Sequence, residues 1–510
     1  MAGFILHRRW AVSLTAFLAG ALAALAMPGH FLIPLLFAAF PIFLWLIVAA
    51  PTRRAAFWRG WWFGFGHFVV GLYWIGNAVL DPSVEAAWAW PFAVAGLPAL
   101  LSVFVGIAAL LAFELNRRGW RPIPSLAVAW VVGELMRGYL LTGFPWNLMG
   151  SVWAVSDAAA QSAWVIGTYG LSLVTVLAAT SPYALLRAPW RSWRAWGPLA
   201  ASLLLIAGMT GFGIWRLATH PTVFDPDVKI RIVQASIPQS DKWKRSELDD
   251  NFLTYLRLSG LSAKDVSVFI WPETALPYFI ADEPARQTLI GRFLPEGSAL
   301  ITGAPRIERV DGKVTKLWNS LFLLNSAGRI DGQYDKMHLV PFGEYLPLRP
   351  LLGAFGLDKL VFGDLDYSPG KVRPALSTPG IPPFWPLICY EIIFPGQVEG
   401  AGDRPGWLVN ITNDAWYGDT SGPRQHLAAA KMRAIEEGLP VARAAGNGIS
   451  AIFDGNGRLL GDLGYNRRGT VDSFLPKPVK EGLFAATGNW TLSVIILCLL
   501  LVSRRQRFPF

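Results

Sequence analysis

Eight long apolar stretches limit what this chain can fold into. A helix needs roughly 20 mostly apolar residues to cross a lipid bilayer. Stretches of about this length lie at 11–27, 31–50, 57–79, 89–114, 122–141, 164–186, 196–216 and 487–503. Because 53% of the 510 residues are hydrophobic, the chain is also too apolar for a soluble protein of its length. The sequence therefore predicts a multi-span α-helical membrane domain.

The placement of arginine predicts how these spans are oriented. Cytoplasmic loops of membrane proteins carry an excess of Lys and Arg. Here arginines gather before the first stretch, after the last one and in alternate connections, whereas the connections at 28–30 and 77–87 lack them. The arginines concerned are Arg8, Arg9, Arg53, Arg54, Arg59, Arg117, Arg118, Arg121, Arg187, Arg191, Arg194, Arg504, Arg505 and Arg507. Both termini are therefore predicted to be cytoplasmic, and residues 217–486 to lie in the periplasm of a Gram-negative cell.

Charge and cysteine content exclude two classes of function. A net charge of +10 can indicate a nucleic-acid partner, but the arginines of the short loops account for it as a topology signal, so no nucleic acid is expected. Cys389 and Cys498 are 109 positions apart, and Cys498 lies in an apolar stretch. They form neither a disulfide framework nor a metal cluster, and the chain carries no metal or nucleotide motif.

The polar segment before the last stretch has the pattern of a folded domain. Helical patterns at 247–263 and 426–437 alternate with strand-like runs, and Asp311-Gly312 and Ala327-Gly328 predict hairpin turns. The strand-like runs are 229–234, 266–271, 299–303, 320–325, 386–389 and 407–412. An α/β or layered α+β domain around a central sheet follows.

The predicted organisation thus has three parts. They are a membrane domain with seven transmembrane helices at 1–216, a periplasmic domain at 217–486, and an eighth transmembrane helix with a short cytoplasmic tail at 487–510.

Reactive side chains lie at or near the ends of three predicted strands of the polar segment. In chain order they are Glu273, Lys336, Glu344, Cys389 and Glu391. A thiolate is the nucleophilic form of cysteine. A carboxylate can accept the thiol proton, and a lysine can stabilise the thiolate and then the oxyanion of a tetrahedral intermediate. Together these residue types form a plausible acyl-transfer site.

Each of these residues also has an ordinary structural explanation. A lone cysteine at a strand end is often a small core residue, Glu273 could cap a helix, and Lys336 could lie at the surface. His338 raises the alternative of a Cys–His dyad. Spacing alone does not decide between these explanations.

Longer motifs give the chain a resemblance to known families. Trp271-Pro-Glu273, then Asp335-Lys336 with Pro341-Phe-Gly-Glu344, then Cys389-Tyr-Glu391, resemble the nitrilase superfamily of carbon–nitrogen hydrolases. With the eight-span layout, they resemble the apolipoprotein N-acyltransferase family, which completes bacterial lipoprotein maturation. The resemblance extends to Gly143-Phe-Pro-Trp-Asn147, Val233-Gln234, Ile237-Pro-Gln239, Asn413-Asp-Ala-Trp-Tyr-Gly418 and Gln425-His426.

The resemblance implies a nitrilase-like α-β-β-α sandwich and a role for each site residue. It implies that Cys389 is the nucleophile, Glu273 the general base and Lys336 the stabiliser of oxyanion and thiolate, with Glu344 supporting the site. Three further residues match positions that line the pocket or a mobile loop: Tyr390, Glu391 and Trp243. One departure is Gly446, where the family usually has asparagine.

The resemblance also implies the reaction. A phospholipid donates an acyl chain to the cysteine as a thioester, and the N-terminal amine of the diacylglyceryl-cysteine of an apolipoprotein accepts it, without a cofactor. The implied enzyme is a monomer of the bacterial inner membrane. The apolar loop 345–367 is expected to be a lid that dips into the membrane interface.

Two other functions remain open at this point. A membrane-tethered amidase would use the same residues with water as the acceptor. A transporter or non-catalytic scaffold would explain the ionisable residues Glu134 and Arg137 inside a predicted span, although these two are spaced to pair on one helix.

Overall fold

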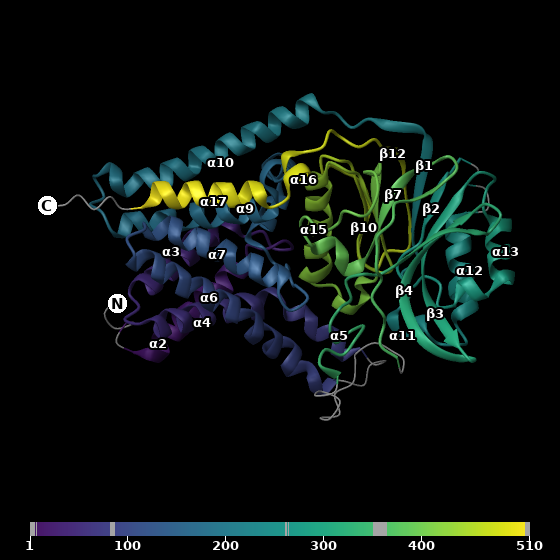
Figure 1. The fold of residues 1–510 in the computed structure, drawn as a ribbon, viewed down its shortest axis with the longest axis horizontal. Coiled ribbons are helices and arrows are strands. Elements are labelled where there is room, and N and C mark those ends of the chain that lie inside the picture. Colours follow the sequence, from purple (N-terminus) through teal and green to yellow (C-terminus); the bar gives the residue numbers. More distant parts are fainter. Residues whose placement is uncertain are drawn as a thin grey trace.

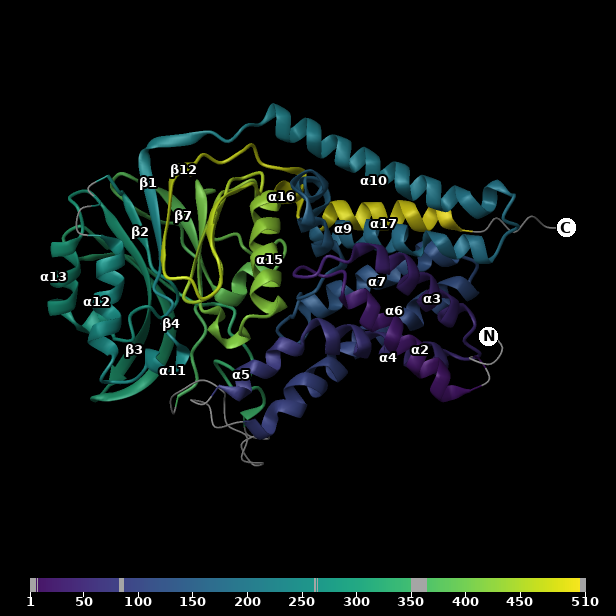
Figure 2. The same cartoon turned by 180° about the vertical axis from the view of Figure 1, so that it is seen from behind.

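The chain folds into a helical part and a part built from two sheets (Figure 1). The computed structural model describes residues 6, 8–81, 87–260, 263, 265–349 and 365–504. The helices of the N-terminal 219 residues and the last helix form one end of the molecule, where both termini also lie. The sheets form the other end, and the view from behind shows the same division (Figure 2).

Helices occupy each of the eight apolar stretches, but they differ from simple spans. They are α2 (Arg9–Ala24), α3 (Leu36–Val48), α4 (Arg53–Gly71) with α5 (Gly76–Leu80), α6 (Leu97–Arg117), α7 (Pro122–Tyr139), α9 (Ala163–Thr180), α10 (Trp193–Thr219) and α17 (Trp490–Ser503). Among the described residues, three helical segments are long and apolar enough to cross a membrane: Ala87–Arg117, Ala163–Leu186 and Trp193–Thr219. A fourth exists if Arg53–Gly71 and Tyr73–Leu80 form one span bent by 56°.

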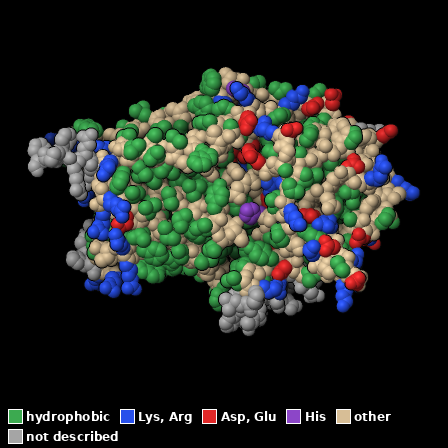
Figure 3. Space-filling view, in the orientation of Figure 1, with side chains coloured by type: hydrophobic (Ala, Val, Ile, Leu, Met, Phe, Trp, Pro, Cys, Tyr) green, Lys and Arg blue, Asp and Glu red, His purple; other side chains and the backbone are tan. Residues whose placement is uncertain are grey.

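The surface of the helical end is suited to lipid. Hydrophobic side chains cover its visible face, Lys and Arg gather at the tip near the termini, and charges of both signs cover the sheet end (Figure 3). The outer helices supply much of this apolar surface: Leu204 and Ile214 of α10 are 73% and 60% exposed, and Leu501 of α17 is 69% exposed. An apolar patch of this extent is typical of contact with a membrane.

Helices α2 and α4 approach each other through glycines. A Cβ atom built on Gly20 would lie 1.9 Å from the main-chain oxygen of Phe63, and one built on Gly66 would lie 2.0 Å from that of Phe17. Both contacts are with backbone, which cannot move aside. Small residues that let backbones approach in this way are common between membrane helices.

Replacing Gly66 by leucine is therefore expected to destabilise the helical part, by about 1–3 kcal/mol or more. Gly211 of α10 is the matched control, because a Cβ there meets no atom within 4 Å. Thermal unfolding in detergent measures the difference: Gly66→Leu should unfold at a clearly lower temperature, and Gly211→Leu at the wild-type temperature. Equal unfolding temperatures would show that the α2–α4 contact is not close.

Two six-stranded sheets form the other part. The first has the order β12-β1-β2-β3-β4-β5 and the second β11-β10-β9-β8-β7-β6. The strands are β1 (Phe224–Gln234), β2 (Val268–Ile270), β3 (Ala299–Val310), β4 (Lys313–Asn325), β5 (Ile330–Asp335), β6 (Leu376–Thr378), β7 (Ile381–Ile388), β8 (Trp407–Thr412), β9 (Val441–Ala445), β10 (Ser450–Phe453), β11 (Leu459–Leu463) and β12 (Gly469–Pro476). Each sheet is mixed: β1-β2-β3 and β7-β8-β9 run parallel, and their neighbours antiparallel.

The sheets pack face to face with helices outside them. Helices α12 (Leu248–Ser259) and α13 (Pro284–Phe293) cover the outer face of the first sheet, and α15 (Ser421–Glu437) lies between the second sheet and the helical end (Figure 1). Side chains alternate accordingly: Ile270 belongs to the core between the sheets, and its neighbour Phe269 to the core under α12. The α-β-β-α sandwich expected from the sequence is confirmed.

The sequence-predicted strands lie in strands of the structure, with one difference that concerns the site. The hairpin between β3 and β4 turns at Asp311 and Gly312, whose φ angles of 51° and 77° suit this turn. The run predicted at 386–389, however, ends as a strand at Ile388, and Cys389 begins a 3₁₀ turn that extends to Ile393.

Candidate active site

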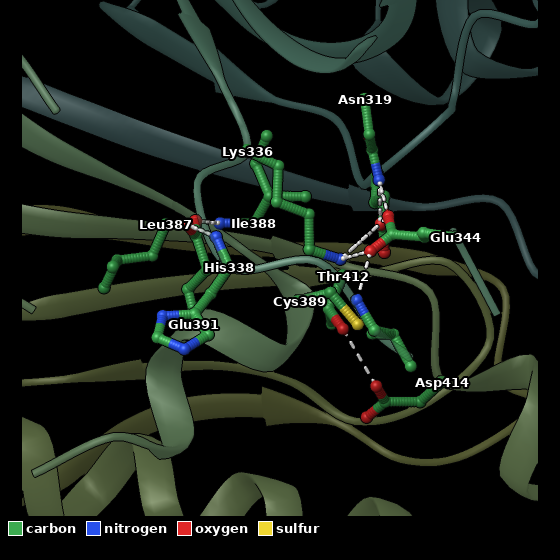
Figure 4. A network of polar contacts seen from close by, with 12 residues as sticks. Asn319, Lys336, His338, Glu344, Leu387, Ile388, Cys389, Glu391, Thr412 and Asp414 are labelled. Atoms are coloured by element: carbon green, nitrogen blue, oxygen red, sulfur yellow. Dashed lines mark hydrogen bonds and ion pairs between the residues drawn. The ribbon is translucent and has the colours of Figure 1, made fainter. Parts of the chain in front are cut away.

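The ends of β2, β5 and β7 bring the predicted site residues together between the two sheets. Glu273 follows β2, Lys336 directly follows β5, and Cys389 directly follows β7. Figure 4 shows the side chains of Lys336, Glu344 and Cys389 converging from different segments. These three side chains and that of Glu273 are buried: Glu273, Glu344 and Cys389 are each 6% exposed, and Lys336 is 1% exposed.

A close backbone approach sets the position of Glu273. A Cβ atom built on Gly303 of β3 would lie 2.7 Å from the Cα atom of Glu273 and 2.5 Å from the main-chain nitrogen of Thr274. Only glycine leaves room at this position. The chain then turns at Thr274, which has a φ of 47°, and the Glu273 side chain is buried.

Glu273, Glu344 and Lys336 form a hydrogen-bonded charge cluster with Asn319 of β4. The Asn319 side-chain amide donates to Glu273 Oε1 at 2.6 Å and to Glu344 Oε1 at 2.8 Å. Lys336 Nζ donates to Glu344 Oε1 at 3.0 Å and lies 3.7 Å from Glu273 Oε1. Buried charges are tolerated when they are paired in this way. Burial alone would lower the pKa of Lys336, but the carboxylates of Glu344 and Glu273 raise it above its ordinary value, so Lys336 stays an ammonium.

Cys389 occupies a main-chain conformation that is uncommon for a non-glycine residue, with a φ of 52°. Its thiol is protonated at neutral pH, because burial raises the pKa of Cys389 to about 12. The carboxylates of Glu273 and Asp414 act in the same direction, whereas Lys336 and a hydrogen bond with Thr412 lower this pKa. The thiol becomes a nucleophile only when a base accepts its proton, and Glu273 is a carboxylate of the same cluster.

Glu391 and Tyr390 fix the turn that carries Cys389. Glu391 is 1% exposed, and its carboxylate accepts from the main-chain nitrogen of Ile388 at 2.8 Å and from the Tyr334 hydroxyl at 2.6 Å. The Tyr390 hydroxyl donates to the main-chain oxygen of Gly143 at 2.8 Å. Both residues therefore hold the loop in place, and Tyr390 ties it to the helical part.

Three other expectations concern residues at the edge of the site. Trp243 is half-buried and follows the short helix α11 (Gln239–Lys242). His338 is engaged elsewhere: its Nε2 lies 2.8 Å from the main-chain oxygen of Thr142, and its ring stacks on Phe394, so the Cys–His338 dyad gains no support. Of the expected lid at 345–367, residues 350–364 lie outside the described part of the chain.

The family departure at Gly446 leaves the local structure intact. Gly446 accepts a main-chain hydrogen bond from Ser236 and donates one to Thr412, both at 3.1 Å. A Cβ atom built there would lie 3.5 Å from Asn413 Oδ1, an ordinary contact. The position therefore has room for a side chain but does not need one to hold the neighbouring strands.

Sequence reasoning missed Lys242, which lies inside the site. Its Nζ donates to the main-chain oxygen of Glu273 at 3.0 Å, and the residue is only 8% exposed. Burial lowers the pKa of Lys242 to about 8, although Glu273 and Cys389 act to raise it. No sequence pattern marks Lys242 as a site residue, because it belongs to a polar run that resembles a solvated loop.

Replacing Lys242 by methionine is expected to raise the unfolding temperature at pH 7 by a few degrees. A buried ammonium with one hydrogen-bond acceptor keeps a desolvation cost that an apolar chain of similar length lacks. The folded pKa of about 8 lies below the ordinary 10.5, so the cost is complete below pH 8 and declines as the pH rises toward 10.5. Thermal unfolding between pH 7 and 10.5 should show the difference between wild type and variant shrinking. A less stable Lys242→Met protein at pH 7 would contradict this account.

A second group contacts the main-chain oxygen of Cys389, a contact that the motifs containing Asp414 and His426 do not reveal. His426 and Asn410 approach the main-chain oxygen of Cys389, and Asp414 and Arg443 hold them in turn. All four side chains are fully buried. Among the described residues, no group of three His, Cys, Asp or Glu side chains is placed to hold a metal ion.

The structure also bears on Glu134 and Arg137. Glu134 Oε1 accepts from Trp130 Nε1 at 2.9 Å and from the Met149 main-chain nitrogen at 2.8 Å. Arg137 Nη1 donates to the main-chain oxygens of Phe144 and Trp146. Each side chain thus anchors the segment that follows α7, rather than bonding to the other on the helix.

Comparison with known proteins gives matches over both parts of the chain. Residues 19–181 match the family model described as the apolipoprotein N-acyltransferase N-terminal domain, and residues 229–475 match the one described as carbon-nitrogen hydrolase. The chain is 43% identical to the apolipoprotein N-acyltransferase of Rhodopseudomonas palustris, with 99% of this chain and 97% of that protein covered. It is 41% identical to that of Bradyrhizobium diazoefficiens, with 99% and 96% covered. Among solved structures, an amidase from Nesterenkonia sp. is 19% identical with a TM-score of 0.36, covering 54% of this chain and 99% of its own.

Proposed function

The chain belongs to the apolipoprotein N-acyltransferase family, and from this premise we propose how its residues carry out the reaction. The enzyme transfers an acyl chain from a phospholipid, through a cysteine thioester, to the N-terminal amine of the diacylglyceryl-cysteine of an apolipoprotein. This is the last step of lipoprotein maturation. The observation that supports the assignment of residues is the buried cluster of Glu273, Lys336 and Glu344, in which Glu273 and Lys336 both interact electrostatically with Cys389.

In the first half-reaction, Glu273 takes the thiol proton of Cys389 and the thiolate attacks an ester carbonyl of the phospholipid. The carbonyl oxygen becomes an oxyanion, which the ammonium of Lys336 stabilises. The intermediate then collapses, the ester C–O bond breaks, and the leaving alkoxide takes the proton from Glu273. A lysophospholipid departs, and a thioester remains on Cys389.

In the second half-reaction, the α-amine of the diacylglyceryl-cysteine attacks the thioester carbonyl and gives a proton to Glu273. Lys336 again faces the oxyanion. Collapse breaks the C–S bond, and the released thiolate of Cys389 recovers the proton from Glu273. The product is an amide, and the enzyme returns to its starting state without a net change in protons.

Glu344 and Asn319 support this cycle without taking part in bond making. Glu344 raises the pKa of Lys336, which keeps Lys336 charged while Glu273 changes its protonation state. Asn319 donates to both carboxylates, which fixes the position of Glu273 relative to Glu344. Trp243, Tyr390 and Glu391 are assigned to the walls of the site and its loop.

The proposed placement is a multi-pass protein of the bacterial inner membrane with its catalytic part in the periplasm. The protein is a bacterial membrane protein with a phospholipid donor and a lipoprotein acceptor. Arginines at alternate connections support the orientation, and the proposed division is 1–216, 217–486 and 487–510. A monomer suffices, because a single chain supplies every proposed site residue.

A membrane-bound site avoids a large solvation cost. Both substrates carry acyl chains, and exposing each CH₂ group to water costs about 0.8 kcal/mol. Such substrates are therefore expected to reach the site from the bilayer rather than through water. The apolar surface of the helices beside the sheets supports this placement (Figure 3).

Whether the acyl acceptor is an amine or water can be tested by supplying the phospholipid donor with and without the amine acceptor. The enzyme is reconstituted in phospholipid vesicles, with and without a diacylglyceryl-cysteine peptide, and lysophospholipid and acylated peptide are quantified by mass spectrometry. The proposal predicts continuous lysophospholipid release only with the peptide, in equal amounts with the amide product. Continuous release of free fatty acid without the peptide would instead identify a membrane-tethered hydrolase.

A further inference from the structure

Two buried side chains contact the main-chain oxygen of Cys389. His426 Nε2 lies 3.2 Å from this oxygen, and Asn410 Nδ2 lies 3.4 Å from it. Both side chains are 0% exposed. Because Cys389 has a φ of 52°, its main chain needs contacts of this kind to keep a conformation that costs about 1–3 kcal/mol.

His426 is itself held from the side opposite Cys389. Its Nδ1 lies 2.9 Å from Asp414 Oδ1, and Arg443 Nη2 donates to Asp414 Oδ2 at 2.5 Å. Burial would raise the pKa of Asp414, but Arg443 and His426 lower it to about 2, so Asp414 is a carboxylate that accepts from Nδ1–H. The ring is thereby fixed with Nε2 directed at Cys389.

Both ring nitrogens of His426 therefore face acceptors. A neutral imidazole has one N–H, and the doubly protonated ring has two. Burial and Arg443 lower the pKa of His426 below its ordinary value, although Asp414 and the contact with Cys389 act to raise it. The hydrogen-bond partners indicate the opposite: a carboxylate lies at Nδ1 and a main-chain oxygen at Nε2, and two acceptors suit only the doubly protonated ring, whose Nε2–H donates to Cys389.

The helical part encloses His426 from its remaining side. The Trp146 ring lies 5.2 Å from the His426 ring between centroids. Gln425, the residue before His426 on α15, accepts hydrogen bonds from the indoles of Trp74 and Trp146 at 3.0 and 2.8 Å and donates to the main-chain oxygen of Gly71. The segments after α4 and α7 thus fix the part of α15 that contacts the nucleophile.

We propose that His426 is a positioning residue for the nucleophile. By donating from Nε2 to the main-chain oxygen of Cys389, it fixes the left-handed conformation that presents the Cys389 thiol to Glu273 and Lys336. This inference rests on the proposed function. Asp414 and Arg443 then act by holding the His426 ring, and Trp146 and Gln425 by fixing the part of α15 that carries it. His426 thereby links the membrane-facing helices to the geometry of the nucleophile.

Two substitutions separate the two hydrogen bonds of the ring. Glutamine places an amide nitrogen near the position of Nε2, and asparagine places one near that of Nδ1. His426→Gln can therefore keep the bond to Cys389, whereas His426→Asn can keep only the bond to Asp414. The purified full-length variants are mixed with phospholipid without acceptor, and thioester formation on Cys389 is followed in a single turnover, alongside thermal unfolding.

The expected result is thioester formation within about tenfold of wild type for His426→Gln and a loss of about 100-fold for His426→Asn, the size of effect that a small displacement of a reacting group produces. In the steady state the loss should fall on kcat, with the KM for phospholipid unchanged. Folded variants that are equally active, or an asparagine variant more active than the glutamine variant, would overturn the proposal.

Two further outcomes are also decisive. If His426→Asn does not fold, the folded His426→Gln protein alone tests the proposal. A loss of thioester formation beyond tenfold in this variant overturns the proposal, and a smaller loss supports it. If wild type forms no thioester, the proposed function fails, and alkylation of Cys389 by iodoacetamide in wild type and both variants then tests the positioning separately. In that case the asparagine variant should be alkylated about 100-fold more slowly than wild type and the glutamine variant within about tenfold. Equal rates would overturn the positioning role.

Discussion

Replacing Cys389 by alanine is expected to abolish acyl transfer, with a loss on the order of 10⁴-fold or more. In the proposed cycle, the sulfur atom of Cys389 accepts the acyl chain in the first half-reaction and releases it in the second, so neither half can proceed without it. The reconstituted assay with phospholipid and diacylglyceryl-cysteine peptide measures the loss as amide product.

The chain contains its own control for this substitution. Cys498, the other cysteine, is exposed on α17 and distant in sequence from the site. Cys498→Ala should therefore retain wild-type activity, and it leaves Cys389 as the only thiol for labelling. Cys389→Ser tests the chemistry further, because a hydroxyl is far harder to ionise. Substantial N-acylation by either Cys389 variant would show that the acyl chain does not pass through this residue.

Replacing Glu273 by glutamine is expected to slow thioester formation by about 10²–10⁴-fold, the usual contribution of a general base. Glutamine has the size of glutamate and can still face Asn319 and Lys336, so the fold should be retained. The residual rate should rise with pH, about tenfold per unit from pH 7 to 9. Without the base, the rate follows the thiolate fraction, and the pKa of Cys389, about 12 in the presence of Glu273, lies well above this range.

Glu344→Gln is the matched comparison for Glu273→Gln. Both substitutions remove one carboxylate from the surroundings of Lys336, but only Glu273→Gln removes the proposed base. Glu344→Gln should therefore show a smaller loss and keep a pH dependence close to that of wild type. If the two variants lost equal activity with the same pH profile, Glu273 would have no special role as a base.

Much of the sandwich could be predicted because its central strands follow a simple pattern. Phe269 and Ile270 are both apolar since each belongs to a different core, and runs of this kind are recognisable in a sequence. Strand β9 was missed because it is five residues long and has Arg443 at its centre. That arginine is fully buried only because Asp414 pairs with it from 29 positions away, a contact that no local pattern shows.

The third apolar stretch, at 57–79, shows a similar limit in the helical part. The sequence predicts one span, whereas in the structure α4 ends at Gly71 and the helical segment Tyr73–Leu80 is bent from it by 56°. The main-chain oxygen of Gly71 accepts from the side chains of Asn147 and Gln425. These partners come from two distant segments, one of them in the sheet part, so the bend depends on tertiary contacts.

The proposed catalytic residues and Glu344 could be predicted from motifs, but two other residues that contact Glu273 could not. Glu273, Lys336 and Cys389 stand in long stretches that resemble known families. Lys242 and Asn319, by contrast, gain their roles from contacts with Glu273, and neither stands in a pattern that separates it from an ordinary loop or strand residue. Such residues become visible only when the strands are placed beside one another.

The most direct test of the account is the mass of the enzyme after exposure to phospholipid in the absence of acceptor. The account predicts a single added acyl chain, located on the peptide that contains Cys389 and removable by hydroxylamine, as a thioester is. Adding diacylglyceryl-cysteine peptide should clear this adduct and yield an equal amount of N-acylated peptide. An unmodified Cys389 under conditions in which the complete reaction proceeds, or an adduct that only water removes, would contradict the account.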